Sequence, residues 1–127
     1  YIADTIGELG TFYTLAPVAL IGGSLVPHGG QNPIEAARHG CAILTGPNTH
    51  NFTDSYAALM EHGGARVVTD GASLAEAADT VLSDSAALKR MTDGANTALE
   101  GLAGALTLTV DAILALLPET EETRRAT

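Results

Sequence analysis

The sequence predicts an α/β domain in which helices flank a parallel β-sheet. Short apolar runs alternate along the chain with segments whose apolar residues recur every three or four positions. Glycine-rich turns separate many of these segments, as expected for strand–helix units. Hydrophobic residues make up 46% of the 127 residues and charged residues 17%. This composition excludes a disordered chain, and the length suffices for one modest domain.

The N-terminal part is predicted to alternate strands and helices. Residues 1–3 should end a strand, and a helix should run from residue 7 or 8 to residue 15, with one face formed by Leu9, Phe12, Tyr13 and Ala16. Residues 18–22 form a continuous apolar run, typical of a strand buried on both faces of a parallel sheet. A helix over residues 33–39 begins with a favourable proline and has Gly40 as its C-cap.

The middle of the chain continues the alternation. Strands are expected at residues 42–44 and 65–68, with a helix between them over residues 52–61 whose inner side carries Phe52, Tyr56, Leu59 and Met60. Ser73 and Glu76 have capping-box spacing and predict a helix that runs to Leu82. Its inward residues should be Leu74, Ala78, Val81 and Leu82.

Two further helices are predicted, over residues 84–99, capped by Ser83 or Asp84, and over residues 101–117, ending at Pro118. The second is almost wholly apolar apart from Asp111 and three threonines. It is at the short limit for a membrane span and has a carboxylate well inside it, which favours a buried or interface helix. Residues 1–118 are predicted to form the domain, and the charged tail at 119–127 should be mobile.

Charge and cysteine content restrict the functions open to the chain. The formal net charge is −9, with only six Lys and Arg residues, which argues against a nucleic-acid-binding protein. Cys41 is the single cysteine, so no intramolecular disulfide can form. It stands in an apolar strand and is interpreted as a buried small hydrophobic residue rather than a reactive thiol.

Residues 22–35 are the most informative segment. An apolar strand leads into four glycines, and these lead into a helix that opens on Asn32 and Pro33. Backbone N–H groups in this setting suit an anion, and Glu35 adds a carboxylate that can accept bonds from sugar hydroxyls. The alternative is a plain helix cap formed by Asn32 and Glu35. The glycines favour binding, because close approach of a ligand would explain the entropy lost on ordering them.

These residues resemble a donor-site signature of the Kdo transferases, glycosyltransferases that attach 3-deoxy-D-manno-octulosonic acid (Kdo) to lipid A precursor. Residues 22–35 match that signature, residues 4–9 match a D-T-x-G-E-L segment, and residues 46–52 match a G-P-x-x-x-N-F turn. The resemblance covers residues 1 to about 95 in order, and the family's proteins are longer. It implies a Rossmann-like, distal part of the C-terminal domain of a two-domain GT-B enzyme.

The resemblance also assigns roles to residues. Glu35 would hold the ribose hydroxyls of the CMP moiety, and the other nucleotide contacts would be Ile6, Gly7, Glu8, Asn32, Pro33 and Ile34. Candidate contacts from the loop are Gly22, Gly23, Ser24, Gly29 and Gly30. From the sequence alone, residues 6–8 could equally be a helix start, with Glu8 near the positive end of the dipole. His28, Gln31 and Ala36 depart from the family pattern, which puts the donor affinity in doubt.

The resemblance implies no cofactor and no metal, and no pair of histidines has metal-ligand spacing. No catalytic residue is predicted in this chain, since the family's general base lies in an N-terminal acceptor domain. The implied partners are CMP-Kdo and a lipid A precursor such as lipid IVA. The parent protein would work at the cytoplasmic side of the bacterial inner membrane and would associate with it through its other half, whereas this chain alone would be soluble or aggregation-prone in the cytoplasm. Two alternatives remain, a GT-B enzyme that uses a UDP-sugar and a non-catalytic remnant half-domain.

Overall fold

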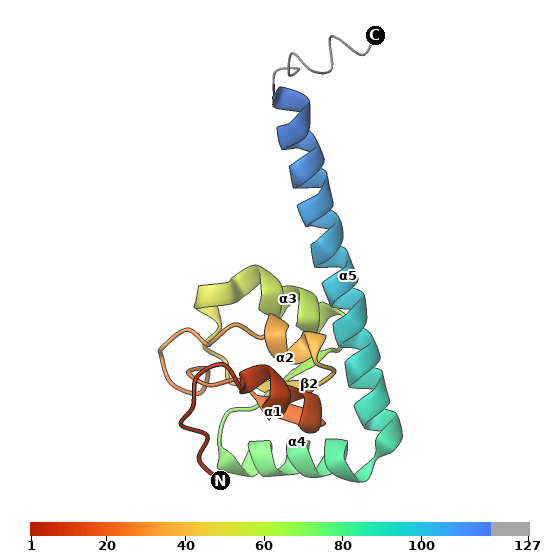
Figure 1. Ribbon diagram of the computed structural model, residues 1–127. Coiled ribbons are helices and arrows are strands. Elements are labelled where there is room, and N and C mark those ends of the chain that lie inside the picture. The colour runs from red at the N-terminus through yellow and green to blue at the C-terminus, as the bar shows by residue number, and fades with distance from the viewer. Residues whose placement is uncertain (118–127) are drawn as a thin grey trace.

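The computed structural model describes residues 1–117 and confirms the α/β class. The elements are α1 (Leu9–Leu15), β1 (Val18–Leu20), α2 (Ile34–Arg38), β2 (Ala42–Thr45), the 3₁₀ turn η1 (His50–Phe52), α3 (Thr53–Glu61), β3 (Ala65–Val67), α4 (Gly71–Ser83) and α5 (Ser85–Leu116) (Figure 1). Residues 119–127, predicted to be a mobile tail, lie outside the described residues.

The three strands form a parallel sheet in the order β1-β2-β3. Residues of the central strand β2 are all buried, and Ile43 and Leu44 belong to hydrophobic clusters on opposite faces. The prediction of a doubly buried strand at 18–22 is wrong in part, because β1 ends at Leu20 and lies at the edge of the sheet. Leu20 is therefore 40% exposed, while Ile21 turns into the core.

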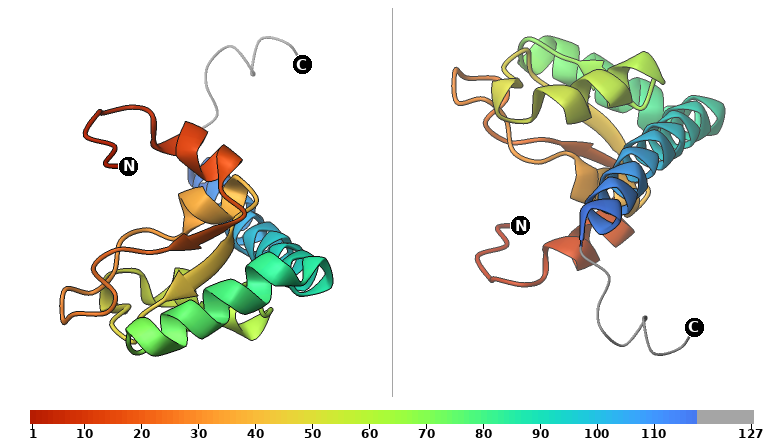
Figure 2. Two further views of the ribbon diagram at one scale, coloured as in Figure 1. Left: turned by 90° about the horizontal axis from the view of Figure 1, so that it is seen from below. Right: turned by 90° about the horizontal axis from the view of Figure 1, so that it is seen from above.

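Helices cover both faces of the sheet (Figure 2). On one face, Ile43 packs in a cluster with Ala36 and Ala37 of α2 and with Tyr56 and Leu59 of α3. On the other face, Leu44 packs with Val68 and with Ala77 of α4, beside the partly buried Leu74, Ala78 and Met91. Helix α5 contributes Met91 to the second cluster and Ala95 and Ala98 to the first, so it joins the two layers.

The C-terminal end of α2 shows why a glycine follows it. Gly40 has φ +83°, and its N–H donates to the carbonyl of Ala37 while the N–H of Cys41 donates to that of Ala36. This pair of bonds is a Schellman motif, in which the left-handed residue is almost cost-free only for glycine. The predicted helix end at Gly40 is confirmed, and Cys41 is buried as expected.

The N-terminal helix is more exposed than its pattern indicated. No residue of α1 is buried, and Leu9 faces solvent, although Tyr13 and Ala16 pack against the first cluster. The predicted strand at residues 1–3 does not form, and both Tyr1 and Ile2 are exposed. Three residues offer few ladder hydrogen bonds, and without a buried face these do not offset the entropy lost on ordering.

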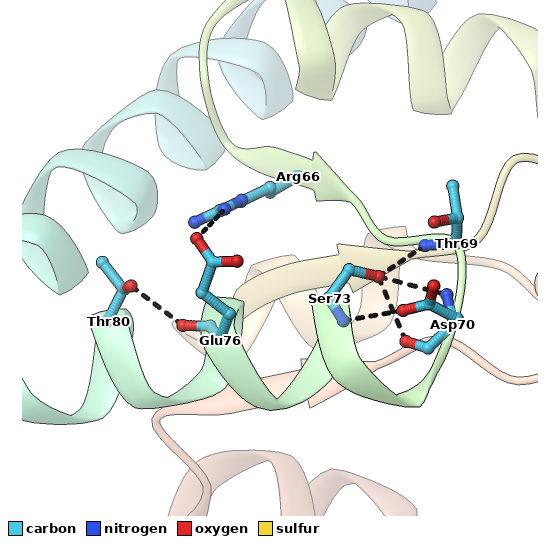
Figure 3. A network of polar contacts seen from close by, with 6 residues as sticks. All are labelled: Arg66, Thr69, Asp70, Ser73, Glu76 and Thr80. Carbon is cyan, nitrogen blue, oxygen red and sulfur yellow. Dashed lines mark hydrogen bonds and ion pairs between the residues drawn. The ribbon is translucent and has the colours of Figure 1, made fainter.

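The capping box of α4 uses different residues from those predicted (Figure 3). Asp70 is the N-cap, and its carboxylate accepts from the N–H of Ser73, whose hydroxyl in turn accepts from the N–H of Asp70. Glu76 does not take part and instead lies 3.7 Å from the guanidinium of Arg66. Ser73 is therefore the third helical residue rather than the cap. Val81 is buried as predicted, but Leu82 is 60% exposed and Ala77 takes the inward position.

The two predicted C-terminal helices are one continuous helix, α5, because Gly101 does not interrupt it. The Asp84 carboxylate caps its N-terminus by accepting from the N–H groups of Ala86 and Ala87. Beyond Leu102 every residue of α5 is exposed, so the helix at 101–117 is not buried within this chain, and the alternative expectation of an interface helix stays a prediction (Figure 1). By length and composition alone α5 could cross a membrane, a test that core helices of soluble proteins also pass.

Candidate functional site

Two loops meet at the carboxyl edge of the sheet, where ligands of parallel α/β sheets bind. The glycine-rich loop, residues 22–31, follows β1, and the second loop, residues 46–52, follows β2. The side-chain amide of Asn51 donates to the carbonyls of His28 (3.0 Å) and Gly30 (3.3 Å). The amide of Asn48 donates to the carbonyl of Ser24 (3.1 Å), so the second loop holds the first.

Ser24 fixes the start of the glycine-rich loop. Its side chain is buried, and its hydroxyl donates to the carbonyl of Ile21 (2.5 Å) while accepting from the N–H of Gly46 (2.8 Å). Gly46 must lie this close, since a Cβ there would stand 2.1 Å from the carbonyl oxygen of Ser24. The Ser24 hydroxyl is thus engaged with the backbone on both sides, and its contact with a ligand stays a prediction.

Contacts and backbone angles within the protein explain why most of the loop positions are glycine. Gly23, Gly29 and Gly30 all have positive φ angles of 70°, 99° and 75°. A Cβ on Gly29 would stand 2.5 Å from the Asn51 side chain, and one on Gly30 would stand 2.8 Å from the Tyr56 hydroxyl. Close approach of the protein's own side chains therefore explains these residues, where the sequence had indicated a ligand. Only Gly22 of the four is exposed with open space beside it, and loop contacts with a ligand stay a prediction.

Tyr56 was not predicted as a site residue, yet it supports the segment that leads into α2. Its buried hydroxyl donates to the carbonyl of Gln31 at 2.7 Å. Burial raises the pKa of Tyr56, so its hydroxyl keeps its proton and remains a donor at neutral pH. Tyr56 and Leu59 lie on the inward face of α3 as predicted, whereas Met60 is exposed. The hydrogen bond of Tyr56 joins residues 25 positions apart and has no signal in local sequence.

Helix α2 does not begin with the plain cap that was the alternative to a binding site. Its N-cap is Pro33, which has no side-chain cap, and the Asn32 carboxamide oxygen accepts from the N–H of Ile34 at 3.0 Å. Glu35 then occupies the first turn, and its side chain does not reach back to form a capping box. Within residues 1–117 the exposed Glu35 carboxylate has no hydrogen-bond or ion-pair partner. It is available to a ligand at this edge.

The first motif lies at the start of α1, which packs against α2. Gly7 has φ +92°, Glu8 is the N-cap of α1, and the Thr5 hydroxyl donates to the Glu8 carboxylate. Residues 6–8 are fully exposed. Two residues later, a Cβ on Gly10 would stand 3.9 Å from the Glu35 carboxylate and 3.0 Å from the His39 ring. The absence of a side chain at Gly10 therefore makes room for the His39 ring, while Glu35 is at ordinary contact distance.

Further contacts hold α1 on α2. The Thr14 hydroxyl and Nδ1 of His39 are 2.8 Å apart, and the rings of Tyr13 and His39 lie 6.4 Å apart between centroids. The pKa of Tyr13 is raised by burial and also by the negative charge of Glu35. These contacts join the later part of α1 to the C-terminal end of α2. That residues 6–8 share one nucleotide site with residues 32–35 stays a prediction.

The candidate site is an open surface. The larger cavity, about 530 Å³, lies elsewhere, between the C-terminal ends of α1 and α2 and the first turns of α5. A smaller one of about 240 Å³ touches the site only at Ile34. Among the described residues, no group of three or more His, Cys, Asp or Glu side chains could hold a metal ion.

Known proteins with similar sequences share one name. The 3-deoxy-D-manno-octulosonic acid transferase of Bordetella pertussis is 35% identical over 112 residues, which cover 88% of this chain and 26% of that protein. The Haemophilus influenzae protein of the same name is 37% identical over 84 residues, which cover 66% of this chain and 20% of that protein. A probable mitochondrial one from Arabidopsis thaliana is 40% identical over 87 residues. The chain thus spans a quarter or less of the length of most of these relatives. No protein-family model matches the chain.

One solved structure has the same fold. The crystal structure of the C-terminal CMP-Kdo binding domain of WaaA from Acinetobacter baumannii superposes with a TM-score of 0.75 at 27% sequence identity. The match covers 78% of this chain and 52% of that domain. Sequence and fold agree, and the chain therefore belongs to the 3-deoxy-D-manno-octulosonic acid transferase family, of whose members it represents one segment.

Proposed function

We propose that this chain is the donor-binding part of a glycosyltransferase that moves Kdo from CMP-Kdo to a lipid A precursor. One observation carries the proposal. The Glu35 carboxylate, which has no partner among residues 1–117, stands at the carboxyl edge of a fold that superposes, with a TM-score of 0.75, on a CMP-Kdo binding domain. The alternative of a UDP-sugar enzyme lacks any such support.

Each part of the nucleotide has a suitable group at this edge. The N–H group of the exposed Glu35 has no acceptor earlier in α2, so it can bind a phosphate oxygen, whereas Ala36 is fully buried. The Glu35 carboxylate accepts bonds from the two ribose hydroxyls, and the exposed Asn32 and half-buried Ile34 contact the CMP moiety. Pro33, which the resemblance also assigned to the nucleotide, is fully buried and supports these residues from behind. Ile6, Gly7 and Glu8 approach the nucleotide from α1. Burial of Pro33 and half-burial of Ile34 keep this segment in place.

The reaction would be a displacement at the anomeric carbon of Kdo. The acceptor hydroxyl oxygen forms the new glycosidic bond, and the bond from the anomeric carbon to the phosphate oxygen breaks. CMP leaves with that electron pair, and the hydroxyl proton goes to a base. We place that base outside this chain, which would supply donor binding and stabilise the departing phosphate through its N–H groups.

The parent protein would act in lipopolysaccharide core biosynthesis, with lipid IVA as acceptor, at the cytoplasmic side of the bacterial inner membrane. The other candidate function is a remnant half-domain without chemistry. It is favoured by the edge position of β1 and by the coverage of only 52% of the solved domain, because the missing half could be needed for binding.

Ligand-observed NMR with CMP and UMP tests the proposal on the 127-residue chain. The NMR signals of CMP should broaden when the chain is added, and this broadening should disappear when CMP is in large excess over the chain. The signals of UMP at the same concentration should broaden much less. Equal binding of both nucleotides would favour the UDP-sugar alternative. A folded protein that binds neither would make the chain a remnant and refute the proposal for it.

A further inference from the structure

Four consecutive backbone carbonyls, those of residues 28–31, accept hydrogen bonds from two residues of one neighbouring segment. The side-chain amide of Asn51 donates to the first and third of them at 3.0 and 3.3 Å, and its backbone N–H donates to the second at 3.0 Å. The fourth carbonyl, that of Gln31, accepts from the Tyr56 hydroxyl at 2.7 Å. Two side chains therefore set the direction of the whole carbonyl row at the end of the glycine-rich loop.

The bond at Gln31 also sets the direction of the peptide group that leads into α2. The peptide between Gln31 and Asn32 is trans, so its N–H points opposite to its C=O. The Gln31 carbonyl points inward to the buried Tyr56 hydroxyl, and the N–H of the exposed Asn32 therefore points outward. Among residues 1–117 this N–H has no acceptor.

The two N–H groups that come before it are used within the protein. Those of Gly30 and Gln31 donate to the carbonyls of Gly23 and Gly22, each at 3.0 Å, and close the loop. The Asn32 N–H is the next donor along the chain, three residues before the carboxylate that the proposed function assigns to the ribose. It is thus a backbone donor that the fold directs toward the space in which CMP is proposed to bind.

Tyr56 is well suited to fix this peptide group. Its side chain is fully buried on α3, where it packs in the first hydrophobic cluster with Ile43 and Leu59. Its hydroxyl also lies against Gly30, where a Cβ would stand 2.8 Å away. A side chain whose rotamer is locked by packing holds its hydrogen-bond partner more precisely than an exposed side chain does.

We propose that Tyr56 is a positioning residue of the donor site, which acts through the peptide between Gln31 and Asn32. It directs the Asn32 N–H toward an acceptor atom of CMP without touching the nucleotide, and Asn51 holds the preceding carbonyls inward. This role rests on the proposed function, since it requires CMP to bind at residues 32–35. It makes donor affinity depend on α3, an element outside the motifs that resemble the family.

The variant Tyr56→Phe tests this role, because it removes one hydroxyl and keeps the ring in the core. Titration of the nitrogen-15-labelled 127-residue chain with CMP, followed by NMR, gives both the affinity and the shift of each amide signal. The Asn32 amide signal of the wild type should move when CMP is added. In Tyr56→Phe this movement should be largely lost, and CMP should bind about threefold to tenfold more weakly, as expected for one misdirected hydrogen bond.

Val81→Ala is the control for an effect of stability alone. Val81 is 2% exposed and lies on α4, which covers the other face of the sheet, so its truncation also destabilises the domain. Thermal unfolding followed by circular dichroism shows whether each variant is folded at the temperature of the titration. Val81→Ala should keep the wild-type affinity for CMP and the wild-type movement of the Asn32 signal.

A second pair of variants tests the carbonyl row independently of Tyr56. Asn51→Asp removes the side-chain donors of the first and third carbonyls and should also weaken CMP binding. Asn48→Asp is its match in charge and size, but it removes only the donor to the Ser24 carbonyl at the other end of the loop. Asn48→Asp should bind CMP more tightly than Asn51→Asp, and equal affinities would contradict the role of the row.

The titrations separate a failure of this role from a failure of the proposed function. Wild-type affinity in Tyr56→Phe, with the Asn32 signal still moving, would overturn the positioning role and leave the proposed function standing. Equal losses in Tyr56→Phe and Val81→Ala would also overturn it, because stability alone would then explain the effect. A folded wild-type chain that does not bind CMP would refute the proposed function, and this role with it.

Discussion

A few side chains outside the predicted motifs give the candidate site its shape. Asn51 and Tyr56 bind the carbonyls of His28, Gly30 and Gln31, so the glycine-rich loop is held by the strand-loop-helix unit that follows it. Removing one partner of a buried hydrogen bond typically costs about 1–3 kcal/mol, which makes the contact of the buried Tyr56 as important to the site as its exposed residues.

The close contacts around Gly30 predict that a side chain there lowers the stability of the domain. In Gly30→Ala the new Cβ would stand 2.8 Å from the Tyr56 hydroxyl and 3.1 Å from the carbonyl oxygen of Asn48. Gly40→Ala is the control, because Gly40 has a similar φ of 83° but nothing within 4 Å. Gly40→Ala should lower the free energy of unfolding by about 1–2 kcal/mol, the cost of the left-handed conformation. Gly30→Ala should cost at least about 1 kcal/mol more.

Urea unfolding followed by circular dichroism measures both values. Equal losses in the two variants would mean that Tyr56 and Asn48 do not enclose Gly30 as the structure has them. The loop would then be looser than described.

At the scale of elements, α5 is held close to α3 by a glycine. A Cβ on Gly94 would stand 2.1 Å from the carbonyl oxygen of His62, whereas one on Gly104 of the same helix meets nothing within 4 Å. Gly94→Ala should therefore destabilise the domain by about 1–3 kcal/mol through overpacking. Gly104→Ala should stabilise α5 by up to about 1 kcal/mol, because alanine loses less entropy in a helix. Thermal melts of both variants check this, and shifts of the same sign would contradict the packing of α5 on α3.

The N-cap of α4 predicts a dependence on pH. Hydrogen bonds from the backbone N–H and the side chain of Ser73 hold the pKa of Asp70 below its ordinary value of 3.8. A lowered folded-state pKa adds stability that is complete above the unfolded-state pKa and is lost as the pH falls through the folded-state value. The gap in unfolding free energy between wild type and Asp70→Asn should thus shrink between pH 5 and pH 3. A gap that is constant across this range would show that the charge of Asp70 does not contribute.

Elements whose signals are local were predictable, and those that depend on neighbours were not. Strand β2 and helices α2 and α3 were found within one or two residues from apolar periodicity and the glycines after each helix. The capping box of α4 was assigned to the wrong pair of residues, because Asp70–Ser73 and Ser73–Glu76 have the same spacing. The tertiary structure selects the pair Asp70–Ser73. The break expected at Gly101 did not occur, since one glycine costs a long helix only about 1 kcal/mol.

The same distinction applies to the candidate site. Asn32, Pro33 and Glu35 were found because a helix start after glycines is visible in a few consecutive residues. The roles of Asn51 and Tyr56 arise only when two loops meet, so the sequence indicated a ligand where the protein's own side chains explain Gly29 and Gly30. Which nucleotide groups these residues contact stays a prediction.

The described molecule leaves two parts of its structure without a neighbour, one in the sheet and one in the last helix. Strand β1 lies at the edge of the sheet, and the distal half of α5 extends beyond the domain (Figures 1 and 2). The first part is the edge strand of the sheet, and the second carries exposed apolar side chains such as Leu106 and Leu114. Both agree with a chain that covers 52% of the solved domain it resembles.

Calorimetric titration of CMP into wild type, Glu35→Ala and Glu61→Ala tests the central claim most directly. Glu61 is the matched control, an exposed glutamate at the far end of α3. Loss of one or two charge-assisted hydrogen bonds should weaken CMP binding by about tenfold to a hundredfold in Glu35→Ala, with Glu61→Ala unchanged and both variants folded. CMP binding by Glu35→Ala with wild-type affinity would contradict the assignment of the donor site.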